Sequence, residues 1–578
     1  MSAAVALEYY VAAIAAQPLV GLLVYPLQRF SHRLARALPV ASSAALLAIL
    51  LLGVQGGTRG VIPLVKLDPL SQIFSLMIAL IGFLCMLYSY EYMARDPSPG
   101  RYYFWMLTFL SSMLLLVIAD SVLLFLLAWE LTSLCSFSLI SHWNFRRESL
   151  AGAFKALAVT ELGSSLVLLG FVLSGGITLS SALERAGAAA QTLLVLGALA
   201  KSAQYPFLIW LPDAMEAPTP VSAYLHAAAM VKAGLYLLAR LSASMQAPVA
   251  WLTVVIGCVS MLAGSFLMLF PNDVKRVLAY STISHLGLLT STVPTAGLVP
   301  TLVHFVNHAV AKALLFLTAG AVEHETGKRS LTELGGLAAG MPITAACFTA
   351  GFLSLAGIPL FGGFVSKWLV LYSAIASGGL GWLLLVSLLA STVFAFMGLA
   401  RVAGGVFFGS PVEGEKAREP GIPMSIPMLV LAAGTVLLGV YPAPLIDWAA
   451  LAAGKAPPQG TSVPALPSGA VGAAVAALLL GAVAIGAVAF FVSRGLRPAA
   501  VYVCGEDPAE ARTSGAHLFS DLFRASRKYL FLADPDAWVV PLAKGLHTIL
   551  ERKLTSRKFC IAATISLILL IALSFAVR

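Results

Sequence analysis

Titratable side chains lie inside stretches of this sequence that are otherwise apolar enough to cross a lipid bilayer. Lys201 and Lys232 flank or fall within the motif WLPDAMEAPTPVSAYLHAAAMVKAG, and Glu130 lies in the apolar run SVLLFLLAWELTSLCSFSLI. A charged side chain in the hydrocarbon core is costly, and such residues typically mark ion or proton paths. These three residues therefore indicate an ion path through a membrane.

Glu130 and Lys201 form the first candidate pair. An ionised carboxylate in the middle of a span needs a cationic or hydrated partner. Pro206, shortly after Lys201, is expected to break the helix and free backbone carbonyls near the lysine. While such a pair is closed the lysine stays protonated, and when the carboxylate moves away a proton can leave. The alternative is a static ion pair that pins two helices together.

Histidines and further lysines extend the candidate path. His226 and Lys232 share one predicted span, and His304, His308 and Lys312 recur every four residues in TLVHFVNHAVAKALLFLTAG. That spacing aligns the three groups along one helical stripe. A lone histidine in a membrane more often makes an interhelical hydrogen bond. Three protonatable groups on one stripe favour a proton wire.

Lys367 ends the series, in GFLSLAGIPLFGGFVSKWLVLYSA. Gly357 and Pro359 predict that this span is discontinuous, as Pro206 does for the span that holds Lys201. Two broken helices, five spans apart and each with a lysine near the break, predict two inverted repeats of about five helices.

The composition supports a membrane protein. Of 578 residues, 59% are hydrophobic and 11% are charged, against roughly 25% charged in a soluble domain. The net charge of +10 is explained by cationic loops facing an anionic cytoplasmic leaflet rather than by nucleic-acid binding. We expect an all-α polytopic membrane protein, because the apolar segments have the length of membrane-spanning helices.

About sixteen such segments are predicted. They are 6–27, 38–55, 69–93, 102–118, 120–141, 150–174, 188–210, 221–243, 248–270, 277–293, 298–321, 341–372, 379–408, 424–443, 469–493 and 558–577. Lys and Arg concentrate in alternate loops, among them those holding Lys275, Arg276, Lys328 and Arg329, and these loops are predicted to be cytoplasmic. An even number of helices places both termini outside, and a count wrong by one reverses the C-terminus.

The predicted division of the chain follows from these segments. It comprises N-terminal transmembrane helices (1–101), the first five-helix repeat (102–243), the second (248–408), C-terminal transmembrane helices (409–493), a cytoplasmic amphipathic segment (494–557) and a final transmembrane helix (558–578). The amphipathic segment is expected either to lie along the membrane surface as a lateral helix or to pack as a small tail on the loops.

The sequence predicts no cofactor, metal or catalytic residue in this chain. Its six cysteines are scattered singly, without the ligand spacing of an iron–sulfur cluster or a zinc site. Any electron transfer must then take place in a partner protein. A standalone membrane enzyme is disfavoured because no nucleophile–base pair recurs in the loops.

Several stretches resemble the antiporter-like proton-translocating subunits shared by respiratory complex I, the Mrp-type Na⁺/H⁺ antiporters and the group 4 membrane-bound NiFe-hydrogenases, including formate hydrogenlyase. They cover roughly residues 65–440 and include LLAWELTSLCSFSLI, LAKSAQYPFLIWLPDAMEAPTPVSAYLHAAAMVKAGLYLLAR, PNDVKRVLAYSTISHLGLL, HFVNHAVAKALLFLTAGAVEH and SLAGIPLFGGFVSKW. The resemblance implies that Glu130 and Lys201 are the coupled pair of the first half. Lys232 would link it to the second half, Lys367 would be the terminal residue, and the stripe of His304, His308 and Lys312 would be the polar axis.

This chain departs from the family pattern at two places. Leu208 replaces a histidine found in many relatives, and Ser164 replaces an acidic residue, with Glu161 three residues earlier. Some relatives have a glutamate at the position of Lys367. The lysine in this chain therefore argues against the type of subunit that has the glutamate.

The resemblance implies a subunit of a redox-driven complex that moves H⁺, or alternatively Na⁺, across the plasma membrane of a prokaryotic cell. Its partners would be other antiporter-like membrane subunits and hydrophilic redox subunits that carry iron–sulfur clusters, NiFe or flavin. The tail VYVCGEDP favours a hydrogenase or complex I-like (NADH:quinone oxidoreductase) assembly. The alternatives are an Mrp-type Na⁺/H⁺ antiporter subunit without redox coupling, and a structural scaffold whose charges hold helices together.

Overall fold

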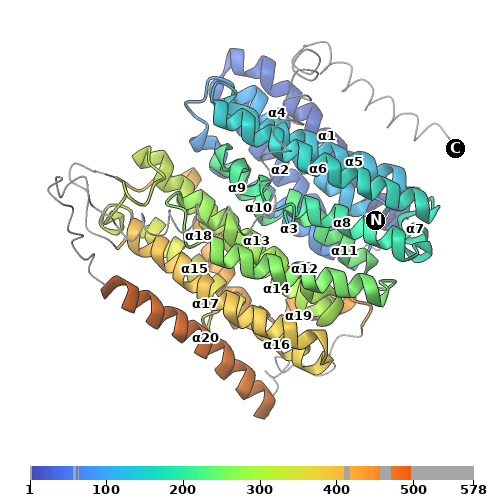
Figure 1. Cartoon of the computed structure of the whole chain (residues 1–578). Coiled ribbons are helices and arrows are strands. Elements are labelled where there is room, and N and C mark those ends of the chain that lie inside the picture. Colours follow the sequence, from blue (N-terminus) through green and yellow to red (C-terminus); the bar gives the residue numbers. More distant parts are fainter. Residues whose placement is uncertain (1–2, 56–59, 63, 409–416, 456–469, 496–578) are drawn as a thin grey trace. The chain divides into compact units, whose positions relative to one another are not determined.

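The computed structural model describes residues 3–55, 60–62, 64–408, 417–455 and 470–495 (Figure 1), and these residues are almost entirely helical. The α-helices are α1 (Ala3–Phe30), α2 (His32–Gln55), α3 (Pro69–Tyr92), α4 (Pro99–Ile118), α5 (Val122–Ile140), α6 (Arg147–Ser174), α7 (Leu179–Arg185), α8 (Ala188–Lys201), α9 (Trp210–Asp213), α10 (Thr219–Ala227), α11 (Met230–Leu241), α12 (Ala247–Leu267), α13 (Val274–Thr295), α14 (Leu298–Thr326), α15 (Pro342–Ala356), α16 (Gly362–Ser377), α17 (Leu380–Val406), α18 (Ile422–Val440), α19 (Ala443–Ala452) and α20 (Ala470–Gly495).

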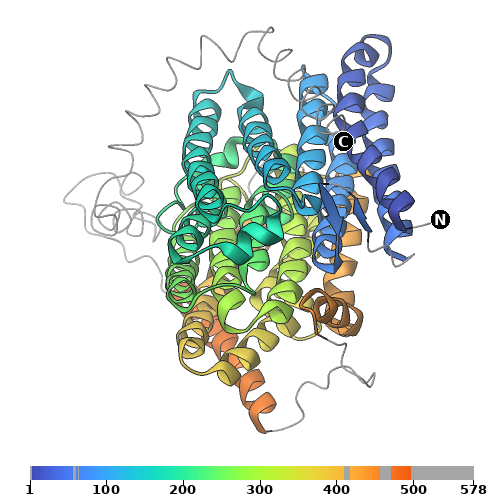
Figure 2. The same ribbon diagram turned by 90° about the vertical axis from the view of Figure 1, so that its right-hand side faces the viewer.

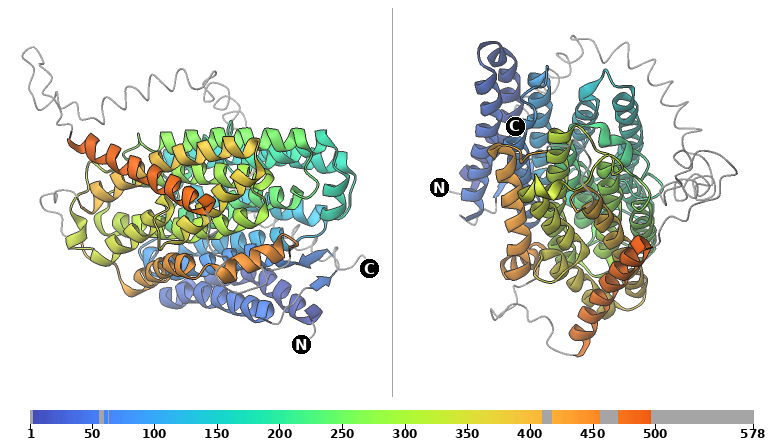
Figure 3. Two further views of the ribbon diagram at one scale, coloured as in Figure 1. Left: turned by 90° about the horizontal axis from the view of Figure 1, so that it is seen from below. Right: turned by 90° about the vertical axis from the view of Figure 1, so that its left-hand side faces the viewer.

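Short elements complete the described part of the chain. They are the 3₁₀ helices η1 (Ser141–Trp143), η2 (Ala214–Glu216) and η3 (Leu337–Ala339), and the strands β1 (Gly60–Ile62) and β2 (Val65–Leu67). The two strands pair antiparallel, with Val61 opposite Lys66, and are the one departure from the predicted all-α class among the described residues. The hairpin packs against α1 (Figure 3).

The prediction of a polytopic helical membrane protein is confirmed, with fewer candidate spans among the described residues than the sequence predicts for the whole chain. Eleven helical segments of the described residues are long and apolar enough to cross a membrane, against about sixteen predicted. The difference has physical causes: α8 has only 14 residues, α15 and α16 are separated by a break, and α13 is rich in charged and hydroxyl side chains. The predicted segments 494–557 and 558–578 lie outside the described residues.

Three helices are interrupted. α8 ends at Lys201 and α9 begins at Trp210, while α15 ends at Ala356 and α16 begins at Gly362, as the prolines and glycines predict. The turn after α15 uses Gly357 with a φ of +86°, a conformation that glycine adopts without strain. A third break, between α10 and α11 at 228–229, falls where the sequence predicts one continuous span. The inverted repeats and the domain boundaries stay predictions.

Helix α14 is enclosed by other helices. It contacts α3, α10, α13, α15, α16, α18 and α19, and its most apolar stretch is wholly buried. Figure 1 shows α13 and α14 running side by side. A helix that carries several titratable side chains needs such cover, because lipid cannot satisfy their polar atoms.

The peripheral helices present apolar surface. α1 and α2 lie side by side, coloured dark blue in Figure 2, and expose leucines such as Leu23 and Leu52. Exposed leucines on membrane-spanning helices are suited to contact lipid chains.

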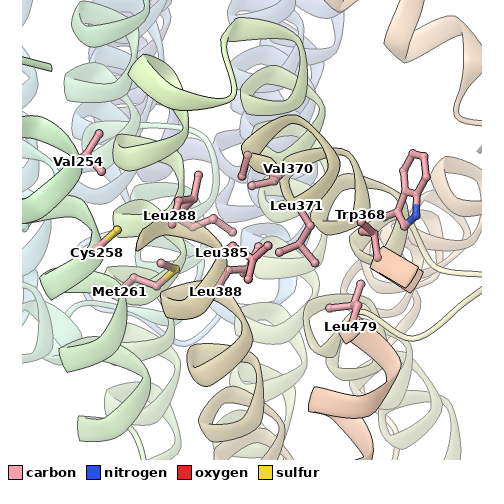
Figure 4. Close-up of a cluster of buried hydrophobic side chains, with 13 residues drawn as sticks. Val254, Cys258, Met261, Leu288, Trp368, Val370, Leu371, Leu385, Leu388 and Leu479 are labelled. Atoms are coloured by element: carbon pink, nitrogen blue, oxygen red, sulfur yellow. The ribbon is translucent and has the colours of Figure 1, made fainter. Parts of the chain in front are cut away.

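An apolar cluster packs the second half of the chain. It joins α12, α13, α16, α17 and α20 through the buried side chains Val254, Cys258, Met261, Leu288, Trp368, Val370, Leu371, Ala374, Leu384, Leu385, Leu388, Val475 and Leu479 (Figure 4). α20 contributes by lying along α17 (Figure 1). Part of this cluster borders the cavity beside Lys367 that is described below. One wall of that cavity is therefore apolar.

Candidate functional site

The predicted stripe on α14 is buried throughout. His304 is 1% exposed, and His308 and Lys312 are 0% exposed. Nζ of Lys312 donates a hydrogen bond of 3.0 Å to the carbonyl oxygen of Leu278 in α13. Each group of the stripe therefore faces protein rather than lipid. In these surroundings only the few polar atoms nearby can hold a proton.

Lys232 is joined directly to the stripe. Its Nζ lies 3.0 Å from Nδ1 of His308, and the ammonium also lies 5.8 Å from the centre of the Phe305 ring. A protonated Lys232 donates to Nδ1 when the neutral imidazole carries its hydrogen on Nε2. The two groups are thus placed to exchange a proton without moving apart.

A second pair, formed by two histidines, lies nearer to the N-terminus of α14. Nδ1 of His285, from α13, is 3.1 Å from Nε2 of His304, and Nδ1 of His304 is 3.0 Å from Oγ of Ser366. Ser366 donates its own hydrogen to the carbonyl oxygen of Gly363, at 3.1 Å. When the Ser366 hydroxyl donates to Gly363, His304 donates to it from Nδ1, and the neutral His304 ring then accepts at Nε2 from Nδ1–H of His285. The tautomers of the two histidines are thus coupled through their shared hydrogen bond.

His285 and Lys367 line the same small cavity, together with Ser284, Ser391 and apolar side chains that belong largely to the cluster of Figure 4. The space suits about one water molecule with hydroxyl partners on its walls. Nζ of Lys367 contacts Oγ1 of Thr392 at 3.2 Å and the carbonyl oxygen of Ala356 at 3.4 Å. The cavity therefore lies between the histidine pair and Lys367.

Lys201 is held at the broken end of α8. Its Nζ donates to the carbonyl oxygen of Trp129 at 2.6 Å and to Oγ of Ser133 at 2.9 Å, and it lies 4.5 Å from the centre of the Trp129 ring. The C-terminus of a helix also favours a cation. Lys367, which belongs to α16, approaches the end of a different helix, since Ala356 is the last residue of α15.

Glu130 has a carboxylate neighbour in α6. The side chains of Glu130 and Glu161 interact, and Glu161 also interacts with Ser133 and with the charge of Lys201. Among the described residues no direct ion pair joins Glu130 to Lys201. The Lys201 ammonium instead bonds to a backbone oxygen and to Ser133. The predicted pair of Glu130 and Lys201 is therefore not in direct contact in this structure, although the carboxylates of Glu130 and Glu161 both lie near the lysine.

The two lysines of the first half do not touch, but their helices are bonded to each other. Oγ of Ser202, next to Lys201, donates to the carbonyl oxygen of Val231, next to Lys232, at 2.9 Å. Gly234 permits this contact, because a Cβ there would lie 2.2 Å from the carbonyl oxygen of Ala198. The site around Lys201 and the α14 stripe are therefore on neighbouring helices, but among the described residues no direct contact between titratable side chains joins Lys201 to Lys232.

His226 lies on α10 before the third break. It is 0% exposed, and neither ring nitrogen has a hydrogen-bond partner in the described part of the chain. Its ring packs 4.7 Å from the ring of Phe316, and the nearest charges acting on it include those of Lys312 and Lys232. Buried polar atoms without a protein partner are commonly satisfied by internal water.

The predicted proton path left out two members of the site, His285 and Glu161. His285 lies in the stretch PNDVKRVLAYSTISHLGLL, but only the pairing of α13 with α14 shows that it meets His304. Glu161 is noticeable as an acidic residue deep in an apolar span, and only the packing of α6 against α5 and α8 brings it to Glu130. Among the described residues no group of three or more His, Cys, Asp and Glu is placed to hold a metal ion.

Comparison with known families decides what these groups belong to. Residues 119–395 match the family described as "NADH:quinone oxidoreductase/Mrp antiporter, TM", and residues 64–103 match "NADH-Ubiquinone oxidoreductase (complex I), chain 5 N-terminus". The chain belongs to the antiporter-like proton-translocating subunit family. The matched region contains every predicted titratable residue from Glu130 to Lys367.

Two curated relatives of this antiporter-like protein are informative. The A/B subunit of a probable K⁺/H⁺ antiporter of Rhizobium meliloti is 39% identical over 404 residues, covering 66% of this chain and 40% of the relative. The A1 subunit of a Na⁺/H⁺ antiporter of Staphylococcus aureus is 37% identical over 417 residues, covering 65% of this chain and 52% of the relative. The chain thus spans about half the length of the curated relatives it matches.

Solved structures agree with the family assignment. A chain of the Mrp complex from Dietzia sp. DQ12-45-1b is 29% identical, with a TM-score of 0.71, and the match covers 99% of this antiporter-like protein and 63% of that chain. A chain of the archaeal membrane-bound sulfane sulfur reductase is 23% identical, with a TM-score of 0.70, covering 77% and 97%. At that identity the second match shows the fold alone.

Proposed function

We propose that this chain exchanges H⁺ for a monovalent cation, Na⁺ or K⁺, as a membrane subunit of an Mrp-type antiporter without redox coupling. The proposal rests on one structural observation above all: four buried groups, Lys232, His308, His304 and His285, come from three neighbouring helices and lie in two hydrogen-bonded pairs. Groups that can each hold one proton, placed within hydrogen-bond reach, are what proton transfer through a membrane requires.

The proposed path has three parts. Lys201, with Glu130 and Glu161, forms one end; Lys232 and the α14 stripe form the middle; and His285, the cavity and Lys367 form the other end. His226 and Lys312 lie beside the middle part, where they add sites for a proton. The carboxylates near Lys201 set whether its ammonium is favoured, because an opposite charge within a few ångströms stabilises the protonated form.

The relatives favour cation exchange over redox-driven pumping. Both curated relatives named above carry antiporter names, whereas the redox complex is similar in fold alone. The sequence prediction of a hydrogenase or complex I-like assembly rested on the tail VYVCGEDP, which lies outside the described residues. We therefore favour the antiporter that the sequence offered as the alternative, in the plasma membrane and together with other membrane subunits.

The test distinguishes cation exchange from redox-driven proton pumping. Inside-out vesicles that contain the full assembly are loaded with a pH indicator, and NaCl or KCl is added without any electron donor. The proposal predicts an immediate proton flux that depends on the cation, and this flux is lost in Lys201→Met vesicles. Proton flux that needs a reductant, and does not respond to either cation, would overturn it.

A further inference from the structure

A crevice opens at the end of the bundle where α13 begins and α14 ends. Its lining includes Lys275, Lys328 and Arg329 on the polar side and Ala319, Val322 and Phe348 on the apolar side. We call this end the basic end. By the distribution of Lys and Arg between loops, it is the predicted cytoplasmic side.

The mouth of the crevice is braced. Arg329 pairs with Glu216 at 2.7 Å and with Asp273 at 2.8 Å, and its carbonyl oxygen accepts from the backbone N–H of Val274 at 3.0 Å. These contacts fix the loop after α14 to the start of α13. The opening is therefore a built feature of the fold.

Lys275 lines the crevice, and its ammonium is held by neighbouring oxygens. Its side chain is 1% exposed, and its Nζ donates to the carbonyl oxygen of Ala217 at 2.8 Å and lies 3.6 Å from Oε2 of Glu323. The same carboxylate oxygen accepts from Oγ1 of Thr219 at 2.6 Å. The Glu323 side chain is 19% exposed, so this ion pair joins a buried lysine to a carboxylate that is accessible to solvent.

Beyond Lys275, one face of α13 carries polar groups up to His285. On α13, Val274, Leu278, Ser281 and His285 are three to four residues apart and share one face. The carbonyl oxygen of Leu278 accepts from Lys312 at 3.0 Å. Oγ of Ser281 is buried without a partner among the described side chains and backbone, and such hydroxyls are commonly satisfied by internal water.

The antiparallel helix α14 matches this series. Val322 and Ala319 line the crevice, and Lys312, His308 and His304 follow toward the far end. Lys275 lies about one helical turn from Leu278, since three residues rise by about 4.5 Å. Only this short interval along α13 separates Lys275 from the backbone oxygen that binds Lys312.

We propose that the crevice is the aqueous access route for protons from the basic end to Lys312, and that the Lys275–Glu323 pair is its gate. With the pair closed, the Lys275 side chain blocks the route. When Glu323 releases it, Lys275 can turn toward the crevice, and water can reach Lys312. Lys275 and Glu323 are positioning residues in this account. The proposal rests on the proposed function, since a gate matters only if protons pass.

Cysteine labelling tests the gate without requiring transport. Val322→Cys places a thiol on the crevice wall, outside the gate, and Ser281→Cys places one inside it with little change in volume. Vesicles that contain the full assembly are treated from the basic-end side with a small, membrane-impermeant methanethiosulfonate. Labelling is measured above that of the parent chain, which holds the native cysteines, Cys347 among them.

The proposal predicts that Val322→Cys is labelled with or without Lys275. Ser281→Cys is protected in the parent and labelled at least about tenfold faster when Lys275→Ala is added, because thiol reaction requires access. Glu323→Gln, which keeps the lysine, raises Ser281→Cys labelling as well. Lys155→Ala is the matched control, since Lys155 pairs with Asp213 at 2.7 Å near the same loops but outside the route, and it leaves Ser281→Cys protected.

Two results would overturn the gate: Ser281→Cys labelling that is equal with and without Lys275, or a Val322→Cys that does not react. Assembly of each variant is checked on native gels, and Glu323→Gln serves if Lys275→Ala does not assemble. The predicted labelling pattern in vesicles that show no cation-driven flux would leave the gate standing and contradict the proposed function. Flux with the wrong labelling pattern would do the reverse.

Discussion

Nζ of Lys232 lies 3.0 Å from Nδ1 of His308, which joins the helix after the third break to the buried stripe of α14. This contact brings a lysine and a histidine from residues 76 apart in the sequence into one hydrogen bond. It is the point at which the two halves of the candidate path meet, because His308 also packs against His285, with ring centres 5.1 Å apart.

The carboxylates near Lys201 are expected to matter more for proton flux than an exposed carboxylate on the same helices. We predict that Glu130→Gln or Glu161→Gln lowers cation-driven proton flux by at least about tenfold, since general acid–base groups typically contribute about 10²–10⁴-fold. Glu148→Gln is the control, because Glu148 is an exposed glutamate of α6. Proton flux and complex assembly are measured on the same vesicles. If a variant lowers the amount of assembled complex but not the flux per assembled complex, the result would support the static ion pair instead.

His285 is expected to conduct although the sequence did not single it out. His285→Phe keeps a ring that can stack on His304, whose ring centre is 5.3 Å away, and removes the nitrogen that bonds to Nε2. We predict a flux loss of about tenfold or more together with a stability loss of about 1–3 kcal/mol, because a buried acceptor loses its donor. Exposed His32 on α2 provides the control, His32→Phe. Parental flux in His285→Phe would remove His285 from the path.

Gly234 is expected to set the approach of α11 to α8. A Cβ at this position would lie 2.2 Å from the carbonyl oxygen of Ala198 and 2.3 Å from Oγ of Ser202. Gly234→Ala should therefore lower the free energy of unfolding by about 1–3 kcal/mol through overpacking. Thermal unfolding in detergent measures it against Gly187→Ala, where nothing lies within 4 Å of the added carbon. Equal melting temperatures for the two variants would contradict this packing.

Asp96, in the loop between α3 and α4, is expected to stabilise the fold in a pH-dependent way. Burial opposes ionisation, but the hydrogen bond from His142 at 3.1 Å and others lower the Asp96 pKa below its usual value of 3.8. A depressed carboxyl pKa gives stability that is present above 3.8 and lost as the pH falls through the folded-state pKa.

The corresponding variant is Asp96→Asn. We expect it to melt at a lower temperature than the parent at neutral pH, by about 1–3 kcal/mol in free energy, because a hydrogen-bonded buried charge is removed. The difference should shrink as the pH falls below 3.8. Melting curves in detergent at several pH values check this, and a difference that does not change with pH would contradict the assignment.

Local patterns predicted which titratable side chains lie together on one helix face and where helices break. The spacing of His304, His308 and Lys312 placed three groups on one buried stripe, and Pro206 and Gly357 lie at breaks that the structure contains. These features depend on helix geometry and on residues that interrupt it, so they can be read from a single segment. The number of spans was less predictable, because polar helices such as α13 cross the bundle only under the cover of their neighbours.

Contacts between distant segments were beyond such reasoning. The meeting of His285 with His304 needs the pairing of α13 with α14, and Glu161 reaches Glu130 through the packing of α6 on α5. The direct partner of Lys201 is likewise a backbone oxygen of Trp129, and no side-chain pattern encodes it. The break between α10 and α11 carries neither proline nor glycine at 228–229, so the sequence held no signal for it.

The central claim is that the buried lysines and histidines carry the proton. The most direct measurement is cation-driven proton flux in vesicles with the full assembly carrying Lys232→Met, which keeps the length of the side chain and removes the proton-binding nitrogen. The account predicts that flux falls to the background of empty vesicles while the assembly remains intact on native gels. Parental flux from an intact Lys232→Met assembly would contradict it.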